Sequence, residues 1–262
     1  MSYRLAVLGD PVAHSRSPAM HEAGLRALGM EGSYLAIRST PEQMVVHAQR
    51  VRSGELTGAN ITMPHKRLAA SLSDSLTERA ARAGSVNTWL CSDGELIGDS
   101  TDIPGVVTAM RRRNVPAERV LVLGTGGAAA AALVALDGAA LWVAGRSSER
   151  GSELIRAVGV EAHVVPWGVP VPGATVVNAT PIGMRGESLP RPVVEASGGF
   201  FDMVYGDRPT PSVTMAMGEC GVATADGLDL LVAQAEISFE LWTGVRPPEG
   251  LFEQVARNAS RR

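Results

Sequence analysis

Apolar runs of strand length alternate with amphipathic stretches over the first hundred residues of the chain. The apolar runs predict strands at 3–9, 33–39 and 56–63. The amphipathic stretches predict helices at 17–29, 40–51, 64–71 and 75–84. Alternation of this kind is typical of βαβ units, so we expect a helix-covered, largely parallel sheet.

Local signals sharpen some of these boundaries. Ser17 and Thr40 each stand directly before a proline, so each is expected to cap a helix whose first position the proline occupies. The stretch 85–98 is expected to form a β-hairpin that turns at Asp93-Gly94. The first hundred residues therefore predict one α/β domain that includes an antiparallel hairpin.

The pattern restarts near residue 102 with a helix and then has the length of one Rossmann-type domain. Strands are expected at 119–124, 140–145, 161–166, 174–179, 200–205 and 221–226. Two amphipathic helices follow, at 228–244 and 251–260, with no strand after them. Because these helices need a sheet to pack on, we expect two domains with a ligand cleft between them. Their expected bounds are 1–101 with 227–262, and 102–226.

The turn after the first strand of the second domain is rich in glycine. In "VLVLGTGGAAAAALVAL" an apolar run ends in Gly124, Gly126 and Ala129, which fits G-x-G-x-x-G/A. The first glycine of this motif allows a tight turn, the second lets backbone N–H groups approach a pyrophosphate, and the third small residue allows close helix packing. The alternative is a plain tight βα turn. The flanking strand and the alanine-rich helix favour a dinucleotide site.

The end of the next strand indicates which dinucleotide binds. An NAD site typically has Asp or Glu about 20 residues after the glycine motif, where it accepts hydrogen bonds from the ribose 2′-OH. In "LWVAGRSSER" this place holds Gly145 and Arg146, with Ser147 and Arg150 just beyond. Two guanidiniums and a hydroxyl can hold a 2′-phosphate, which a carboxylate would repel. The alternative is a solvated arginine pair, and the prediction is NADP.

Composition narrows the class of protein. The chain has 262 residues, of which 45% are hydrophobic and 19% charged, and its net charge of −3 gives no support to nucleic-acid binding. Cys91 and Cys220 lack metal-ligand spacing, so reduced thiols and a cytoplasmic location are expected. The start "MSYRLAVLGD" enters a strand directly, so we expect neither secretion nor a membrane span. His14 and His21 lack an acidic neighbour at ligand spacing, so no metal site is expected.

Four polar clusters fall at the ends of predicted elements in the first domain: "HSRSP" (14–18), "NITMPHK" (60–66), "SVNT" (85–88) and "GDSTD" (98–102). Ser15 and Ser17 lead into a helix N-terminus, which suits an anionic ligand group. Asn60 and Thr62 end a strand, and Lys66 lies just inside the next helix. Each cluster alone has a structural explanation in capping, turn formation or solvation. Together, beside a nucleotide domain, they favour a small hydroxylated, anionic substrate.

These residues also carry a resemblance to a known family. The motifs "GDPVAHSRSPAMHEAG", "GANITMPHK", "GSVNT", "GDSTD", "GTGGAAAA", "NATPIGM", "FDMVY…TP" and "DGLDLLVAQAEISFELWTG" occur in the order found in shikimate dehydrogenases. The likeness runs from about residue 5 to 245, nearly the whole chain. It implies an α/β fold with an N-terminal substrate domain, whose mixed sheet is mainly parallel, and a Rossmann NADP-binding domain. The C-terminal helices complete the substrate domain.

The resemblance implies the site residues as well. The implied substrate-binding positions are Ser15, Ser17, Thr62, Asn87, Asp102, Tyr205 and Gln234. Asn60, from the second polar cluster, is expected to bind the substrate with them. The implied cofactor-binding positions are Gly124, Thr125, Gly126, Gly127, Ala128, Arg146, Ser147, Arg150, Thr180, Met203 and Gly227. Lys66 and Asp102 are the expected catalytic residues.

The reaction of the family fits these residue types. Shikimate dehydrogenases reduce the ketone of 3-dehydroshikimate with NADPH to give shikimate, on the chorismate route to aromatic amino acids. Hydride arriving at a carbonyl carbon leaves an oxyanion, which needs a proton donor or a positive charge within hydrogen-bond reach. Lys66 is the candidate general acid, or otherwise an electrostatic stabiliser. Asp102 would hold the ring hydroxyl and orient the lysine.

Two positions depart from the family pattern. The usual Asn before Thr-Asp is Ser100 here, and the usual Asn-Arg-Thr cofactor turn is Gly145-Arg146-Ser147. Related subfamilies act on quinate or aminoshikimate, some with NAD, and are the alternative assignments. A non-catalytic ligand sensor is a further alternative, disfavoured by the presence of both Lys66 and Asp102. The sequence leaves the oligomeric state open between a monomer and a homodimer.

Overall fold

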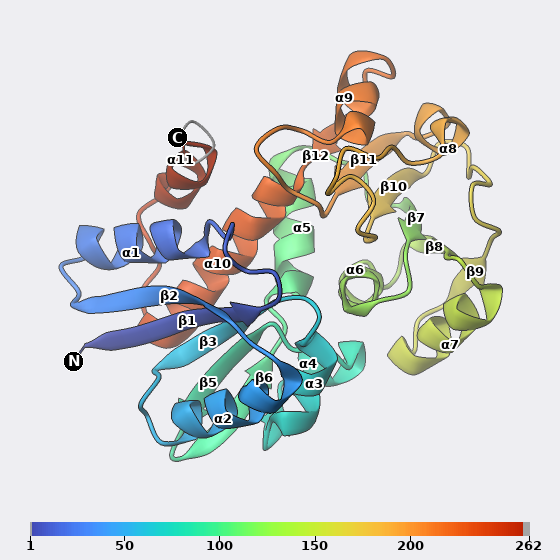
Figure 1. Cartoon of the computed structure of the whole chain (residues 1–262). Coiled ribbons are helices and arrows are strands. Elements are labelled where there is room, and N and C mark those ends of the chain that lie inside the picture. The colour runs from blue at the N-terminus through green and yellow to red at the C-terminus, as the bar shows by residue number, and fades with distance from the viewer. Residues whose placement is uncertain (1, 259–262) are drawn as a thin grey trace. The chain divides into compact units, whose positions relative to one another are not determined.

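Figure 1 presents the computed structural model of the chain, which describes residues 2–258. The chain divides into two compact units. The first contains the residues up to Thr101 and those from Gln234 onward, and the second is Asp102–Ala233. No helix within residues 2–258 is long and apolar enough to cross a membrane.

The first unit is built on a six-stranded mixed sheet with the order β2-β1-β3-β5-β6-β4. Its strands are β1 (Tyr3–Gly9), β2 (Gly32–Arg38), β3 (Gly58–Ile61), β4 (Ser75–Leu76), β5 (Thr88–Ser92) and β6 (Glu95–Asp99). Strands β2 and β3 run parallel to β1, and β4 runs parallel to β6. Strand β5 is antiparallel to both of its neighbours, β3 and β6. The predicted mixed, mainly parallel sheet is confirmed, and the short strand β4 was not predicted.

Helices flank this sheet, and the alternation of β1 supplies a core to each of its faces. The helices are α1 (Ser17–Ala27), α2 (Pro41–Arg52), α3 (Lys66–Leu72), α4 (Glu78–Ala83) and α11 (Leu251–Asn258). Ala6 and Leu8 pack in a core with Met44 of α2, while Leu5 and Val7 belong to a separate core. This is the period-two pattern expected of a strand covered on both faces. Residues 259 and 260 of the last predicted helix lie outside the described residues.

Two of the predicted turns and caps are confirmed, and one predicted cap is wrong. Thr40 caps α2 as predicted, accepting a hydrogen bond from Gln43 N–H in a capping box. The hairpin turns at Asp93 and Gly94, which both have positive φ. The prediction that Ser17 caps α1 was wrong, because the backbone is already helical one residue earlier and Ser17 is the first helical residue. The Oγ of Ser15 accepts the Ser17 N–H instead, at 3.3 Å.

The second unit contains a six-stranded parallel sheet with the order β12-β11-β10-β7-β8-β9, which is the Rossmann order. Its strands are β7 (Arg119–Leu123), β8 (Ala140–Ala144), β9 (Ala162–Val164), β10 (Thr175–Asn178), β11 (Gly199–Asp202) and β12 (Thr224–Ala225). Its helices are α5 (Asp102–Arg112), α6 (Gly127–Ala135), α7 (Ser148–Val158), α8 (Arg191–Glu195) and α9 (Pro211–Gly218). The expected Rossmann fold is confirmed.

Helix α10 (Gly227–Thr243) contributes residues to both units. Division by contacts places residues 227–233 in the second unit, whereas the sequence-based boundary lay at Gly227. One reason is an ion pair within the second unit, in which the Arg113 guanidinium donates to Asp229 at 2.7 Å and ties the first turn of α10 to the end of α5. The residues of α10 from Gln234 onward belong to the first unit.

Candidate functional site

Loop segments that carry predicted substrate residues meet at one edge of the first sheet. Strands β1 and β3 are parallel, so their carboxyl ends lie at the same edge, and Thr62 N–H donates to Leu8 O at 2.9 Å. Strand β5 begins at that edge because it is antiparallel to β3, and Ile61 N–H donates to Asn87 O at 2.8 Å. Loop residues at strand ends commonly form ligand sites on such sheets.

Lys66 lies at this edge as the first residue of α3. Its carbonyl accepts a hydrogen bond from Val86 N–H at 3.0 Å, which fixes the start of α3 against the segment that carries Asn87. The preceding His65 is buried, and its Nε2 lies 2.7 Å from Ser39 O. The backbone of Lys66 is therefore held on both sides.

The hydroxyls of Ser17 and Thr62 differ from most polar groups at this edge. Neither side chain forms a hydrogen bond with another residue in the part of the chain that the structure describes. Ser17 is 4% exposed and Thr62 is half-buried. Gly9 lets Thr62 lie close to the end of β1, since a Cβ there would approach Thr62 Cγ2 to 2.2 Å. Both hydroxyls are thus available to a ligand.

The Asn60 amide, by contrast, is fully engaged by the protein. Its Oδ1 accepts the Tyr34 hydroxyl at 2.7 Å. Its Nδ2 lies 3.2 Å from Asn87 O, 3.1 Å from Thr88 Oγ1 and 3.0 Å from Ser238 Oγ. With both ends of the amide satisfied, the geometry gives Asn60 a role in holding the start of β5. Its role as a substrate ligand stays a prediction.

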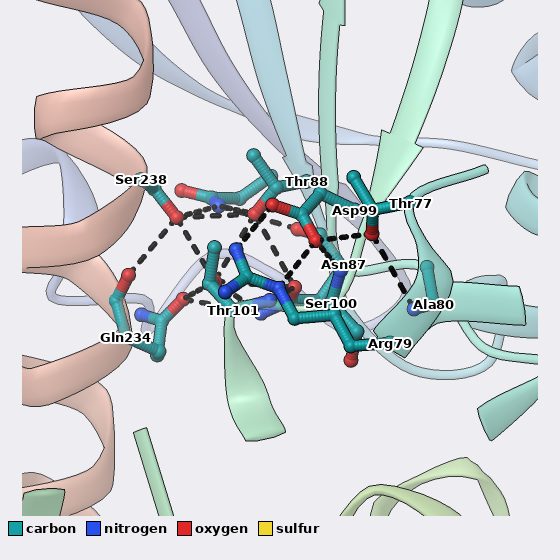
Figure 2. A network of polar contacts seen from close by, with 11 residues as sticks. Thr77, Arg79, Ala80, Asn87, Thr88, Asp99, Ser100, Thr101, Gln234 and Ser238 are labelled. Carbon is teal, nitrogen blue, oxygen red and sulfur yellow. Dashed lines mark hydrogen bonds and ion pairs between the residues drawn. The ribbon is translucent and has the colours of Figure 1, made fainter. Parts of the chain in front are cut away.

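Asn87 is the centre of the same network, which Figure 2 shows from close by. Its Nδ2 donates to Thr101 Oγ1 at 3.0 Å and to Gln234 Oε1 at 3.3 Å, and its Oδ1 accepts Thr101 N–H at 2.7 Å. The network therefore joins three of the predicted substrate residues, Asn60, Asn87 and Gln234. It also fixes the residue directly before Asp102.

Sequence reasoning missed three buried hydroxyls that complete this network. Thr88, Thr101 and Ser238 are each 0% exposed, and their Oγ atoms lie within 3.1 Å of one another. All three stand inside quoted motifs, "GSVNT", "GDSTD" and "DGLDLLVAQAEISFELWTG", so a signal was present. The contact between Ser238 and Thr88 carried no local signal, because the two residues lie 150 apart along the chain.

Asp99 anchors the other end of the network (Figure 2). Its carboxylate accepts hydrogen bonds from Thr77 Oγ1 at 2.6 Å, from Arg79 Nε at 2.7 Å and from Ser100 N–H at 2.7 Å. Burial acts to raise the pKa of Asp99, but the hydrogen bonds and the Arg79 charge outweigh it and hold the pKa below its ordinary value. The Oγ of Ser100, where the family has Asn, is buried without a hydrogen-bond partner among the described residues.

A buried aromatic cluster lies behind Tyr34. The His21 ring stacks on Tyr34 at 4.4 Å between centroids and also contacts Phe239, Trp242 and Phe252. Desolvation by complete burial lowers the pKa of His21 to about 3, so the imidazole is neutral. The cluster therefore packs against the Tyr34 ring, whose hydroxyl donates to Asn60 Oδ1.

In the second unit the glycine turn has the geometry that a pyrophosphate site needs. Gly124 has φ +124°, and a Cβ there would lie 2.8 Å from Ala179 O, so only glycine fits. At Gly126 a Cβ would meet nothing within 4 Å, which leaves the turn open to a ligand. Helix α6 starts at Gly127 with no side-chain cap and no acidic residue in its first turn. Its N-terminal N–H groups therefore suit a phosphate.

The arginines expected at the 2′-phosphate are exposed. The guanidiniums of Arg146 and Arg150 make no hydrogen bond or ion pair with any residue between 2 and 258. Ser147 caps α7, accepting Arg150 N–H at 3.3 Å, and its hydroxyl donates to Glu149 at 2.6 Å. At Gly145 a Cβ would approach Thr125 Cγ2 to 2.7 Å. The Thr125 methyl thus occupies space that the family's Asn side chain would need.

The loops with Thr180, Met203 and Tyr205 follow β10 and β11. Asn178 Oδ1 accepts the Thr180 hydroxyl at 2.6 Å, and Asn178 O accepts Met203 N–H at 3.0 Å. Gly227 lies against the same segment, because a Cβ there would come within 2.4 Å of Val204 O. Backbone contacts rather than side-chain packing therefore place Met203 and Gly227.

Asp202, the last residue of β11, holds these loops in place through hydrogen bonds. Its Oδ1 accepts Asn178 Nδ2 at 2.9 Å and Val204 N–H at 3.0 Å, while its Oδ2 accepts the Thr210 hydroxyl at 2.6 Å. Burial raises the pKa of Asp202 above its ordinary value despite these hydrogen bonds, and the charge of Asp226 adds to the effect. None of these loop contacts was apparent from the sequence.

Comparison with known proteins finds relatives that match nearly the whole length of the chain. Residues 7–89 match the family model of the shikimate dehydrogenase substrate binding domain, and residues 227–257 match that of the shikimate 5′-dehydrogenase C-terminal domain. The shikimate dehydrogenase (NADP(+)) of Thermus thermophilus is 38% identical over 262 residues, covering 98% of each chain.

Solved structures of similar fold include a shikimate dehydrogenase and a reductase of another substrate. The shikimate 5-dehydrogenase of Thermus thermophilus in complex with NADP(H) and shikimate has a TM-score of 0.88 and 37% identity, covering 98% of this chain and 99% of that one. The ligand-free 5-ketofructose reductase of a Gluconobacter strain has the same TM-score of 0.88 at 25% identity, with coverage of 98% and 99%. The full-length similarity to curated relatives shows that the chain belongs to the shikimate dehydrogenase family.

Proposed function

We propose that the chain catalyses the reversible, NADP-dependent interconversion of shikimate and 3-dehydroshikimate. The main structural support is the edge of the first sheet, where Thr62 and Lys66 follow β3, Asn87 precedes β5 and Ser17 starts the helix that follows β1. The Asn87 amide, held by Thr101 and Gln234, and the hydroxyls of Ser17 and Thr62, which no described residue binds, suit a small polyhydroxylated ligand. The curated relatives at 34–38% identity are NADP(+)-dependent shikimate dehydrogenases, which supports the same assignment.

The second unit supplies the groups that would hold NADP. Backbone N–H groups from Gly124 to Ala128 would bind the pyrophosphate, and the Arg146 and Arg150 guanidiniums would bind the 2′-phosphate. The bound cofactor supplies the hydride for the reaction. The open space at Gly126 fits this group, as do the two guanidiniums, which pair with no residue that the structure describes.

The first unit and Asp102 would supply the acid–base chemistry. As negative charge develops on the substrate oxygen, the Lys66 ammonium donates a proton to it, and in reverse the neutral amine takes that proton back. The Asp102 carboxylate accepts a hydrogen bond from a ring hydroxyl and orients it. The Ser15 and Ser17 hydroxyls, at the start of α1, bind the substrate carboxylate.

The test is a matrix of initial rates followed at 340 nm. Shikimate, quinate and aminoshikimate are each offered with NADP⁺ and with NAD⁺, and 5-ketofructose is offered with NADPH. We expect the highest kcat/KM for shikimate with NADP⁺. A preference for quinate, aminoshikimate or NAD⁺ would move the chain to a sister subfamily. Binding of shikimate without turnover in any combination would favour a sensor.

We also propose a cytoplasmic location and a monomeric or homodimeric state. Support for the location comes from Cys91 and Cys220, which are both free thiols in the structure. Size-exclusion chromatography with light scattering distinguishes the two assembly states.

A further inference from the structure

Glu149 is a charged residue at the NADP-binding segment that the proposed function leaves unused. It lies in the first turn of α7, two residues after the capping Ser147. Its carboxylate accepts the Ser147 hydroxyl at 2.6 Å. This hydrogen bond, followed by one from its own backbone N–H, holds the pKa of Glu149 below its ordinary value. Glu149 is therefore ionised at neutral pH.

The same contact uses the only proton of the Ser147 hydroxyl. A serine hydroxyl has one O–H donor, and here that donor points to Glu149 Oε2. One of its acceptor sites takes Arg150 N–H at 3.3 Å. In this arrangement Ser147 has no donor left for a phosphate oxygen.

Glu149 also occupies the helix end that would favour an anion. The N-terminus of an α-helix carries partial positive charge and attracts one negative group, whether a side chain or a phosphate. In the first turn of α7 the carboxylate of Glu149 already fills this role. Arg146 and Arg150 stand on either side of it in the sequence, and their guanidiniums pair with no described residue. An incoming 2′-phosphate would gain both guanidiniums but meet a like charge.

We propose that Glu149 is a specificity determinant that limits the preference for NADP over NAD. It competes with the 2′-phosphate for the Ser147 hydroxyl and for the N-terminus of α7. NAD has no 2′-phosphate, so its binding does not sense this competition. This inference rests on the proposed NADP site and deepens it.

The direct test is Glu149→Gln, which removes the charge and keeps the side-chain size. The dissociation constant for NADP⁺, measured by calorimetry, is expected to fall about three- to tenfold at low ionic strength. The constant for NAD⁺ should change less than about twofold. The gain should shrink in about 1 M salt, because screening weakens a repulsion between exposed charges. Glu153→Gln, an exposed glutamate one turn further along α7, is the matched control and should change neither constant.

A double-mutant cycle tests the role of the serine proton. Ser147→Ala should weaken NADP⁺ binding more in a Glu149→Ala background, where the hydroxyl is released, than in the unmodified chain, where Glu149 holds it. Any loss from removing the α7 cap is common to both backgrounds and cancels in the cycle. Unfolding curves of all variants check that α7 remains folded.

The outcomes separate this inference from the proposed function. If the unmodified chain turns over shikimate with NADP⁺ and Glu149→Gln binds NADP⁺ no more tightly, the inference alone fails. An equal gain in Glu153→Gln also overturns it, since the effect would then be one of general charge. If the unmodified chain binds no NADP⁺, the proposed cofactor and the inference both fail.

Discussion

Asp99 and Asp202 are buried carboxylates, one in each unit, and their pKa values shift in opposite directions. Both are at most 1% exposed, and burial raises the pKa of each. Asp99 also has the Arg79 guanidinium, and its net pKa is lowered. Asp202 has only neutral donors and no cationic partner among the described residues, and its net pKa is raised. At Asp202 the hydrogen bonds do not offset desolvation and the like charge of Asp226, whereas at Asp99 hydrogen bonds together with a cation do offset desolvation.

The two polar regions also differ in what they leave open. Around Asp99 and Asn87, the buried amides and hydroxyls other than Ser100 Oγ satisfy one another and so can hold a substrate in one geometry. Around Arg146 and Arg150, charge is exposed and no residue from 2 to 258 pairs with it, so recognition there rests on electrostatic attraction. Changes in the first region should therefore affect turnover and stability, and changes in the second mainly cofactor affinity.

The largest expected effect belongs to Lys66→Ala, which tests whether the first region carries the chemistry. Loss of the positioned ammonium should lower kcat about 10²-fold or more and leave shikimate binding largely intact. Steady-state rates with shikimate and NADP⁺, together with calorimetry for shikimate, measure both. Arg67→Ala, at the exposed neighbouring position, is the control and should turn over normally. Unchanged turnover in Lys66→Ala would remove the assigned role.

Next in size is Asp99→Asn, which removes the charge that Arg79 pairs with. We expect a loss of about 2 kcal/mol in the free energy of unfolding at pH 7, less than for a fully buried pair because the Arg79 side chain is 35% exposed. Urea unfolding measures it. Asp74→Asn, which disrupts a more exposed pair with Arg52, should cost less.

The lowered pKa of Asp99 also sets a pH dependence. Its stabilisation is fully present above the ordinary value of 3.8 and is lost as the pH falls through the lower, folded-state pKa. The difference between the unmodified chain and Asp99→Asn should therefore narrow below pH 3.8. A difference that stays constant into strong acid would contradict the role of the charge.

A smaller effect is expected for Arg146→Ala in the second region. Loss of one charge-assisted contact should weaken NADP⁺ binding about tenfold and NAD⁺ binding little. The weakening should diminish at high salt, unlike the effect of Lys66→Ala on kcat. Arg156→Ala, an exposed arginine in the last turn of α7, is the control. Equal losses for both cofactors would mean that Arg146 does not contact the 2′-phosphate.

The smallest effect is expected for Asp202→Asn, which removes a buried charge that has no cationic partner within the described part of the chain. The free energy of unfolding at pH 7 should change by less than about 1 kcal/mol, since relief from desolvation offsets weaker hydrogen bonds. Because the folded-state pKa is raised, this group destabilises the fold as the pH rises above 3.8, and the substitution should remove that trend. A loss as large as that of Asp99→Asn would break the comparison.

The sequence allowed good predictions wherever contacts are local. The Thr40 cap joins residues three apart, and the Asp93-Gly94 turn depends on two adjacent backbone conformations. The glycine turn was interpreted correctly for the same reason, since strand, turn and helix are contiguous. Ser17 failed as a cap because the backbone before it was already helical, and hydroxyl type does not report backbone angles.

The candidate site was predictable as a set of residues but not as an arrangement. Asn60, Asn87 and Gln234 were selected from motifs, yet their hydrogen bonds depend on strand pairing and on a helix more than 140 residues away along the chain. Arg79 had no distinguishing local pattern. Glu149 was missed because a surface glutamate in a first helical turn is common.

By itself the sequence determined the order of strands and helices, the glycine turn and the family of the protein, because these depend on local spacing and on ordered motifs. The tertiary structure decided which polar groups are satisfied by the protein and which stay open to ligands. It also decided the sign of the pKa shifts at Asp99 and Asp202. Both depend on burial and on partners brought from distant parts of the chain, and hydrogen-bond satisfaction and desolvation exist only once those partners meet.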